Sequence, residues 1–219
     1  MEIYNADGSQ AEMCGNGIRC VGKFLHDEGY VKCDCVSIET LAGIKLLKLI
    51  IKDNVCIGAR VDMGEPILSP KKIPVLWNDD KMINEEIFAG GRHYNVTCVS
   101  MGNPHAVIFT NEPVEDMNLA AIGPLFENHK IFPTRTNTEF VNVIDRNTLR
   151  MRVWERGAAE TMACGTGASA VAVAAILNGL CDREVTVKLN GGDLKIIWQL
   201  QDNHVIMEGP AVRVCTGDY

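Results

Sequence analysis

Long hydrophobic runs are missing from this sequence. The longest apolar stretch, residues 170–177, is far shorter than the roughly 18 residues that a membrane-spanning helix needs. The first residues also lack the basic, apolar and small-residue pattern of a secretory signal. We therefore expect a cytoplasmic protein that has no membrane partner.

Clusters of basic residues are missing as well. The 28 Asp and Glu residues outnumber the 21 Lys and Arg residues, and the formal net charge is −7. Nucleic acids and anionic membranes attract concentrated positive charge, so we expect neither as a partner. A chain of 219 residues that is 47% hydrophobic is long enough to form one large or two small cores.

The nine cysteines do not have the pattern of a disulfide framework or a metal site. Their number is odd, no CxxC pair occurs, and the five histidines show no HxxxH or HExxH spacing, so we predict no metal. Cys33 and Cys35 come nearest to a metal or redox pattern. Five others have apolar neighbours and are predicted to be buried: Cys20, Cys56, Cys98, Cys181 and Cys215.

One short pattern occurs twice in this sequence. The segment AEMCGNGIRCVGKFLHDEG contains Cys14, and TMACGTGASAVAVAAILNG contains Cys164, 150 residues later. The correspondence runs from the cysteine through two glycines to Gly29 and Gly179, where both segments end. A repeat at this distance indicates two related domains rather than a solenoid, whose units are about 20–50 residues long.

Each copy predicts a helix that begins directly after the cysteine. In residues 15–28, Ile18, Val21 and Leu25 share one face, whereas residues 165–178 are apolar on nearly every side. We expect two hairpins in the second half, formed by residues 140–144 with 149–154 and by 185–189 with 194–198. The predicted fold class is α+β, with two pseudo-symmetric domains, each a mainly antiparallel β-sheet or barrel around a central helix.

A domain boundary is predicted near residues 63–66, where a strand-like segment ends and a proline-punctuated stretch begins. The first domain would comprise residues 1–65, joined by a final strand from about 210–219. The second would comprise residues 66–209.

The two cysteine turns combine a thiol with a helix start. The backbone N–H groups and the helix dipole favour an anion there, which lowers a thiol pKa from about 8.5 to between about 3.5 and 7.5. Cys14 and Cys164 are therefore predicted to be paired acid/base groups: one thiolate removes a proton from a carbon, and the other thiol returns a proton to the opposite face. A single copy could be only a tight helix entry, but packing gives no reason to repeat the cysteine.

At these residues the chain resembles the diaminopimelate epimerase family, cofactor-independent two-cysteine enzymes of bacterial lysine and cell-wall biosynthesis. The matching stretches span nearly the whole chain in the family's order, and they are YNADGSQAEMCGNGIRC, MGNPHAV, RTNTEFV and WERGAAETMACGTGASA. Proline racemases are less similar, because their first motif typically reads CGHG. The resemblance implies conversion of LL-diaminopimelate to the meso form, no cofactor, a small diamino dicarboxylic acid substrate and a homodimer.

The resemblance also implies roles for individual residues. Cys14 and Cys164 would be the acid/base pair. The turns beside them would hold the substrate's α-carboxylate through Gly15, Asn16, Gly165 and Thr166.

Five further residues would recognise the rest of the substrate, namely Asn5, Asn103, Asn137, Glu155 and Arg156. Arg156 suits a bidentate clamp on a carboxylate, and Glu155 could accept from an ammonium group. His105 would lie near the site and orient a neighbour. Each also has a structural alternative: the first two asparagines could shape turns, Asn137 could be a strand-edge residue, the Glu–Arg pair could be solvated, and the histidine could be purely structural.

Two departures from the family stand out. Members begin with a segment containing a GxGNDF-type motif, which this sequence lacks before Met1, so we expect an N-terminally truncated first domain. Ala159 stands where the family usually has glycine. Two other functions remain open: a related amino-acid racemase or isomerase, and an inactive thiol or binding protein.

Overall fold

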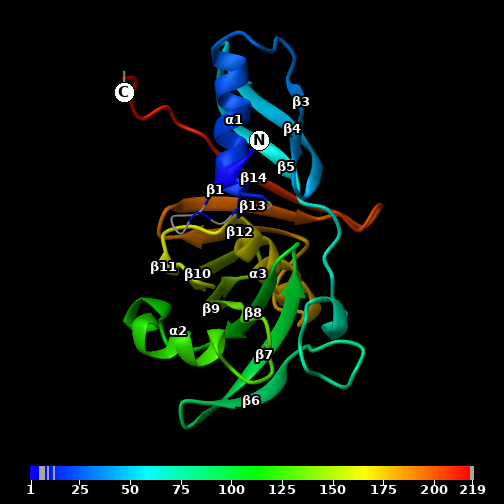
Figure 1. Cartoon of the computed structure of the whole chain (residues 1–219), viewed down its shortest axis with the longest axis vertical. Coiled ribbons are helices and arrows are strands. Elements are labelled where there is room, and N and C mark those ends of the chain that lie inside the picture. Colours follow the sequence, from blue (N-terminus) through cyan, green and yellow to red (C-terminus); the bar gives the residue numbers. More distant parts are fainter. Residues whose placement is uncertain (5–7, 9, 12, 218–219) are drawn as a thin grey trace. The chain divides into compact units, whose positions relative to one another are not determined.

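The computed structural model describes residues 1–4, 8, 10–11 and 13–217 (Figure 1). The chain divides into two units, one formed by Met1–Asp62 with Met207–Tyr219 and the other by Met63–Ile206. The first unit therefore contains both the beginning and the end of this sequence.

The first unit contains one helix and a sheet. Its helix is α1 (Gly15–Asp27), and its sheet has the order β3-β4-β5-β14. These strands are β3 (Cys35–Thr40), β4 (Gly43–Lys52), β5 (Val55–Asp62) and β14 (Val205–Pro210), the last belonging to this unit from Met207 on. Two short strands, β1 (Ile3–Tyr4) and β2 (Gln10–Ala11), pair before the helix.

Helix α1 is amphipathic, as its sequence predicted, and packs on β4 and β5. Ile18 and Gly22 are buried on the packed face. A Cβ atom on Gly22 would lie 2.9 Å from Leu49 and 3.0 Å from Leu47, so a larger residue would require these leucine side chains to shift. The opposite face of the helix, which carries Cys20 and Phe24, is exposed.

The second unit holds a larger sheet, in the order β13-β12-β10-β9-β8-β7-β6, with β11 on β10. Its strands are β6 (Glu85–Ala89), β7 (Arg92–Ser100), β8 (Pro104–Phe109), β9 (Asn137–Asp145), β10 (Thr148–Glu155), β11 (Ala159–Thr161), β12 (Glu184–Leu189) and β13 (Gly192–Trp198). Its helices are α2 (Leu119–Glu127), α3 (Gly165–Leu177) and the short 3-10 helices η1 (Pro70–Lys72) and η2 (Val114–Asp116).

Both predicted hairpins are confirmed, as β9–β10 and β12–β13. Two other pairs, β8–β9 and β10–β12, are parallel. Each parallel pair is joined by a connection that contains a helix, α2 in the first case and α3 in the second. Parallel neighbours need such a crossover, because a short turn can only reverse the chain.

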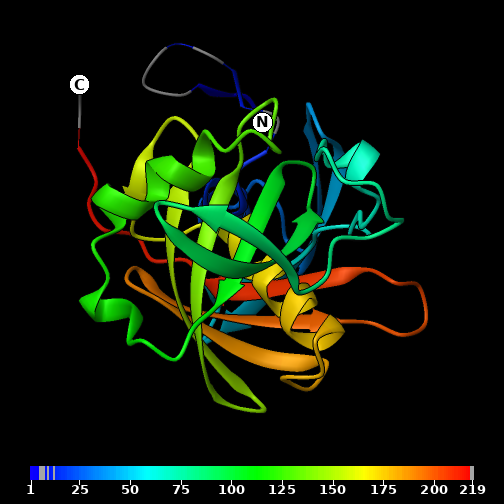
Figure 2. The ribbon, with the colours of Figure 1, turned by 90° about the horizontal axis from the view of Figure 1, so that it is seen from below.

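Helix α3 forms the centre of the second unit. It contacts β7 to β10, β12 and β13, and in Figure 2 its yellow ribbon lies among the green and orange strands of the unit. Ten of its residues are buried, and most are alanine or valine, so backbone and sheet approach closely. A second cluster centres on Phe126, whose ring meets those of Tyr94 and Phe140 edge to face, at 5.0 and 5.7 Å between centroids.

The predicted burial of the cysteines is only partly correct. Cys56, Cys98 and Cys181 are buried, whereas Cys20 and Cys215 are exposed. Cys20 lies on the outer face of α1, and Cys215 lies in the segment that follows β14. For Cys20, apolar neighbours in sequence do not imply burial, because successive helix residues point in different directions.

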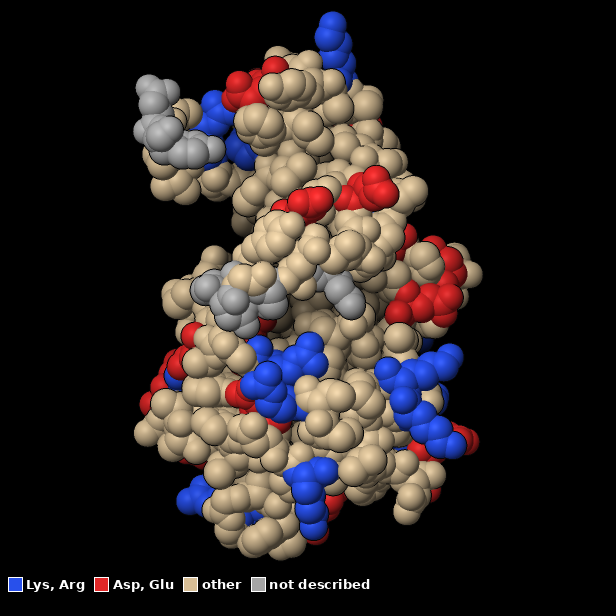
Figure 3. Space-filling model, in the orientation of Figure 1, with Lys and Arg blue, Asp and Glu red and all other residues tan. Residues whose placement is uncertain are grey.

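Charged side chains of both signs appear in small separate groups on the face drawn in Figure 3. Ion pairs within the second unit include Arg150 with Glu115 at 2.6 Å and Arg152 with Glu160 at 2.8 Å. None of the described helices is long and apolar enough to cross a membrane.

Candidate functional site

The two cysteine turns have the same backbone form. Cys14 (φ −134°, ψ 113°) and Cys164 (φ −128°, ψ 114°) are the N-caps of helices of 13 residues each. Each helix is followed by a glycine with positive φ, 77° at Gly29 and 69° at Gly179, a conformation that favours glycine. The sequence repeat is therefore also a repeat of local structure.

The strand pairs before the turns repeat as well. In the first unit Ile3 pairs with Ala11, and in the second unit Val153 pairs with Thr161. These partners are related by the same offset of 150 residues as the cysteines. Ala159, at the start of β11, has a φ of 60°, which explains why glycine suits this position.

The Cys14 turn is fixed by a buried arginine. The half-buried Cys14 Sγ accepts a hydrogen bond from the Gly17 N–H at 3.3 Å. Arg19 donates to the Gly15 carbonyl at 3.0 Å and to Asn16 Oδ1 at 3.2 Å. The same guanidinium donates to the Pro210 carbonyl at 3.2 Å, and so links the turn to the end of β14.

The Cys164 turn has a different environment. Cys164 is buried, and its Sγ lies 3.4 Å from Thr166 Oγ1. Burial raises the pKa of Cys164 well above the usual thiol range, and the negative charges of Glu155 and Glu139 raise it further. The helix start was expected to lower this pKa. Desolvation outweighs the helix N-terminus here because a buried thiolate loses its hydration.

A buried acid and imidazole lie beside the Cys164 turn. His105 Nδ1 is 2.6 Å from Glu139 Oε1, and His105 Nε2 is 3.0 Å from Asn103 Oδ1. Both members of the His–Glu pair are fully buried, and Glu139 Oε2 has no hydrogen-bond partner in the described structure. Burial raises the pKa of Glu139, although the imidazole opposes this.

Gly167 allows this pair to approach the turn. A Cβ atom at Gly167 would lie 2.8 Å from Glu139 Oε1 and 3.3 Å from Cys164 Sγ, and both distances are too short for a relaxed contact with alanine. The second glycine of the motif therefore leaves room for the Glu139 carboxyl group next to the thiol.

Side chains from two elements, β9 and α2, hold the turn at Glu155 and Arg156. Asn137 Oδ1 accepts from the Arg156 backbone N–H at 2.8 Å, and Asn137 Nδ2 donates to the Pro104 carbonyl at 3.0 Å. Glu127 accepts from the Trp154 indole at 2.7 Å and from the Gly157 N–H at 3.0 Å.

The two charged side chains of this loop are also placed by contacts. The Glu155 carboxylate accepts from the Thr161 hydroxyl. The exposed Arg156 guanidinium donates to the Thr134 carbonyl at 3.2 Å. The loop thus presents a carboxylate and a guanidinium next to the strand that leads to Cys164.

The predicted site residues fall into two groups. In the second unit, hydrogen bonds link Asn103 to His105, Asn137 to Arg156, and Cys164 to Thr166. In the first unit, Cys14, Gly15 and Asn16 form one turn, while Asn5 lies outside the described residues. Cys33 and Cys35, the pair nearest to a metal or redox pattern, are exposed. The carboxylate between them, Asp34, forms an ion pair with Lys48 at 2.5 Å. Within the described part of the chain, no group of three or more potential ligands is placed to hold a metal ion.

Sequence reasoning missed Glu139, Arg19 and Glu127, although they organise the site. A signal for Glu139 was present: it follows Asn137 by two residues in a strand, which puts both side chains on one face. Glu127 and the contact of Arg19 with Pro210 gave no such signal, because the partners Trp154 and Pro210 are distant in sequence.

Known proteins confirm the family resemblance. The profile of the family described as diaminopimelate epimerase matches residues 1–69 and 97–214. A diaminopimelate epimerase of Acetivibrio thermocellus is 56% identical over 220 residues, and one of Methanococcus maripaludis is 55% identical over 218. Both alignments cover 100% of this chain and 78% of the relative.

A solved structure shares the fold at low sequence identity. A hydroxyproline epimerase from Agrobacterium vitis, with bound trans-4-hydroxy-L-proline, superposes with a TM-score of 0.68 at 15% identity. The match covers 95% of this chain and 66% of that protein. With the family profile and close relatives along its whole length, the chain belongs to the diaminopimelate epimerase family.

Proposed function

We propose that this protein inverts the Cα stereocentre of LL-diaminopimelate to the meso form, a step of lysine and peptidoglycan precursor biosynthesis. The observation that carries this function is the pair of cysteine-capped helix starts, Cys14 and Cys164, in a chain of the diaminopimelate epimerase family. Inversion requires one base and one acid, and two cysteines can supply both without a cofactor.

In this mechanism one thiolate removes the Cα proton, and the other thiol returns a proton to the opposite face of the carbon. The raised pKa of Cys164 favours its thiol form at neutral pH, so it begins as the proton donor in one direction of the reaction. The reverse direction exchanges the roles.

The backbone of the two turns stabilises the reacting carboxylate. The first N–H groups of a helix have no partner within the helix and point at its N-terminus. Gly15, Asn16, Gly165 and Thr166 occupy these positions in the two helices. Negative charge that develops on the substrate carboxylate as the proton leaves is stabilised by such fixed dipoles.

The loop after β10 recognises the rest of the substrate. Arg156 would pair with a carboxylate in a bidentate fork, and Glu155 would accept from an ammonium group. Asn103 and Asn137 are the other proposed substrate-binding residues of this unit. Asn5 is assigned to substrate binding by the family motif alone. Asn137 already holds the Arg156 backbone, which supports a role in placing that side chain.

His105 and Glu139 act as positioning residues. The carboxylate fixes Nδ1 of the imidazole, and the imidazole Nε2 then contacts Asn103. These contacts hold the Asn103 side chain in one orientation, because each polar group in the series has its neighbour as a hydrogen-bond partner. Negative charge on Glu139 raises the pKa of Cys164, which further favours its thiol form.

Proton exchange with solvent tests this function. LL-diaminopimelate incubated with the protein in deuterated water, with chelator present and pyridoxal phosphate absent, should gain deuterium at Cα and yield the meso isomer. A panel of other amino acids, including proline and hydroxyproline, is the control. Label in a different amino acid and none in diaminopimelate would favour a related racemase, and no label in any substrate would contradict epimerase activity.

We further propose that the two units are the two domains of this enzyme, and that it acts as a cytoplasmic homodimer. The repeated register of the strand pairs before each turn supports the domain assignment. The dimer rests on the family resemblance. Sedimentation equilibrium would measure the molar mass, and a mass near the 24.0 kDa of one chain would contradict the dimer.

A further inference from the structure

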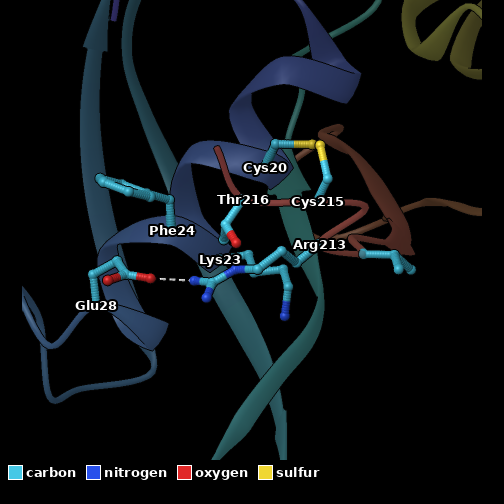
Figure 4. Close-up of a pocket in the computed structure, with 8 residues that line it drawn as sticks. Cys20, Lys23, Phe24, Glu28, Arg213, Cys215 and Thr216 are labelled. Carbon is cyan, nitrogen blue, oxygen red and sulfur yellow. Dashed lines mark hydrogen bonds and ion pairs between the residues drawn. The ribbon is translucent and has the colours of Figure 1, made fainter. Parts of the chain in front are cut away.

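Two cysteines outside the proposed catalytic pair meet at one cavity of the first unit. Cys20 and Cys215 are both exposed free thiols and both line a cavity of about 290 Å³. Cys20 comes from the outer face of α1, and Cys215 comes from residues 211–217, which follow β14. Figure 4 shows the two side chains pointing toward each other. The chain thus brings together two thiols that are 195 positions apart.

Specific contacts hold the chain from Pro210 onward against β5 and α1. The Ala211 N–H donates to the Ile57 carbonyl at 3.0 Å, and Arg19 on α1 donates to the Pro210 carbonyl at 3.2 Å. Arg213 then forms an ion pair with Glu28, just after the helix ends (Figure 4). Because Cys215 is only two residues beyond Arg213, this ion pair limits how far its thiol can move from the helix.

The charged groups of the cavity already have partners. Lys23 pairs with Asp27 at 2.6 Å, and Arg213 pairs with Glu28. Phe24 and Val212 supply apolar surface. Since both cations are neutralised within the unit, the cavity is poorly suited to an anionic ligand. The pair of thiols is its chemically reactive feature.

We propose that Cys20 and Cys215 form a redox-modification site, at which a peroxide converts the two thiols into a disulfide that ties residues 211–217 to α1. In the first step one thiolate attacks an oxygen of hydrogen peroxide. The O–O bond breaks, the sulfur becomes a sulfenic acid, and the hydroxide that leaves takes up the proton that the thiol lost, which gives water. The second thiolate attacks the sulfenic sulfur, forms the S–S bond and releases a second water. The peroxide gains the two electrons that the thiols lose.

This site is distinct from the two cysteine turns. Its oxidation consumes neither Cys14 nor Cys164. It does act on the helix that begins at Cys14, because Arg19 contacts both the Gly15 carbonyl and the Pro210 carbonyl. The disulfide would therefore restrain the segment that this arginine already holds, and we expect slower proteolysis of residues 211–217 in the oxidised protein.

Disulfide mapping tests the site directly. The reduced full chain is treated with stoichiometric hydrogen peroxide, free thiols are alkylated, and peptides are analysed by mass spectrometry without reduction. We expect a cross-linked peptide pair containing Cys20 and Cys215, lost after treatment with dithiothreitol. Alkylation of both residues to the same extent as in untreated protein, or a cross-link of Cys215 to another cysteine, would overturn the site.

Three variants separate a built site from random oxidation. Cys20→Ser should abolish the cross-link, whereas Cys35→Ser, which removes another exposed thiol of the same unit, should leave it intact. Glu28→Gln removes the partner of Arg213 and should slow cross-linking about two- to fivefold, as expected for an exposed ion pair. Cross-linking of Cys215 in the Cys20→Ser protein, or an unchanged rate in Glu28→Gln, would contradict the proposed geometry. Because the readout is a peptide mass, failure here is independent of epimerase activity.

Discussion

Helices α1 and α3 begin in the same way and are buried differently. Both have an N-cap cysteine, a length of 13 residues and a closing glycine with positive φ. Helix α1 packs one face on a sheet and exposes the other, whereas α3 contacts six strands and is buried over most of its length. Cys14 is therefore half-buried and Cys164 buried.

The comparison shows that equal local geometry does not give equal chemistry. The Cys164 turn lies beside two carboxylates, Glu139 and Glu155, and its thiol has a raised pKa. The Cys14 turn is held by a guanidinium, Arg19, which bonds to the two residues that follow the cysteine. In the proposed mechanism, the two residues that exchange acid and base roles therefore come from one motif in two electrostatic environments.

The largest expected effect is the loss of either thiol. Cys14→Ala and Cys164→Ala should each reduce kcat by at least about 10²-fold, because each removes a group that transfers a proton in the proposed mechanism. Circular dichroism would check that both variants fold. Cys33→Ala removes an exposed thiol outside the turns and should retain full activity. Normal turnover in either turn variant would show that the two helix starts do not share one mechanism.

The second effect compares the last glycine of each CGxG turn. Gly167→Ala places a methyl group 2.8 Å from Glu139 and should lower the free energy of unfolding by about 1–3 kcal/mol, with a fall in kcat. Gly17→Ala is the matched control, since its nearest contact would be Cys14 Sγ at an ordinary 3.5 Å. We expect a change within about 1 kcal/mol there. Urea denaturation measures the free energy of unfolding of both variants. Equal losses in the two would contradict the expected difference in packing between the turns.

The third effect concerns the reactivity of the Cys164 thiol. Because its pKa is raised, alkylation by iodoacetamide should be slow at neutral pH and accelerate as the pH rises above the usual thiol range. Glu155→Gln removes one negative charge, lowers this pKa, and should speed alkylation of Cys164 by up to about tenfold. Mass spectrometry resolves the rate at each site, and Cys33 serves as an internal reference. Unchanged Cys164 labelling in the variant would contradict the electrostatic account.

The smallest effect compares the C-terminal ends of the two helices. Asp27 accepts from the Cys56 N–H at 2.9 Å and from Lys23 at 2.6 Å, and Asn178 donates to Thr97 at 3.0 Å. Although burial opposes it, these bonds hold the pKa of Asp27 well below its usual value. The contribution of Asp27 to the free energy of unfolding is therefore present above about pH 4. It is lost as the pH falls toward the pKa of Asp27 in the folded state.

Asp27→Asn should thus lower the free energy of unfolding by about 1–2 kcal/mol at pH 7, and by less as the pH falls below about 4. Asn178→Ala, which removes a neutral amide, should give a loss of about 1 kcal/mol that does not depend on pH. Denaturation curves at several pH values measure both variants. Parallel pH dependence in the two would show that charge does not distinguish the helix ends.

Much of the local structure was predictable from sequence. The two helices, their cysteine caps, both hairpins and the family followed from short-range patterns and motifs, because helix and turn signals are local. The parallel pairs β8–β9 and β10–β12 were not predicted, since alternation within a strand does not reveal its neighbour's direction. Burial of Cys20 and Cys215 was predicted wrongly as well. Apolar neighbours in sequence do not report which face of α1 carries Cys20, or that the segment with Cys215 lies outside any helix or strand.

The sequence by itself determined that Cys14 and Cys164 begin two equivalent helices, because capping and glycine signals act within a few residues. Only the tertiary structure decided their surroundings. Glu139 comes close to Cys164, and Arg19 bonds to Pro210, because strands distant in sequence pair or pack there. A thiol's pKa depends on burial and on charges nearby in space, and the spacing of the motif predicts neither.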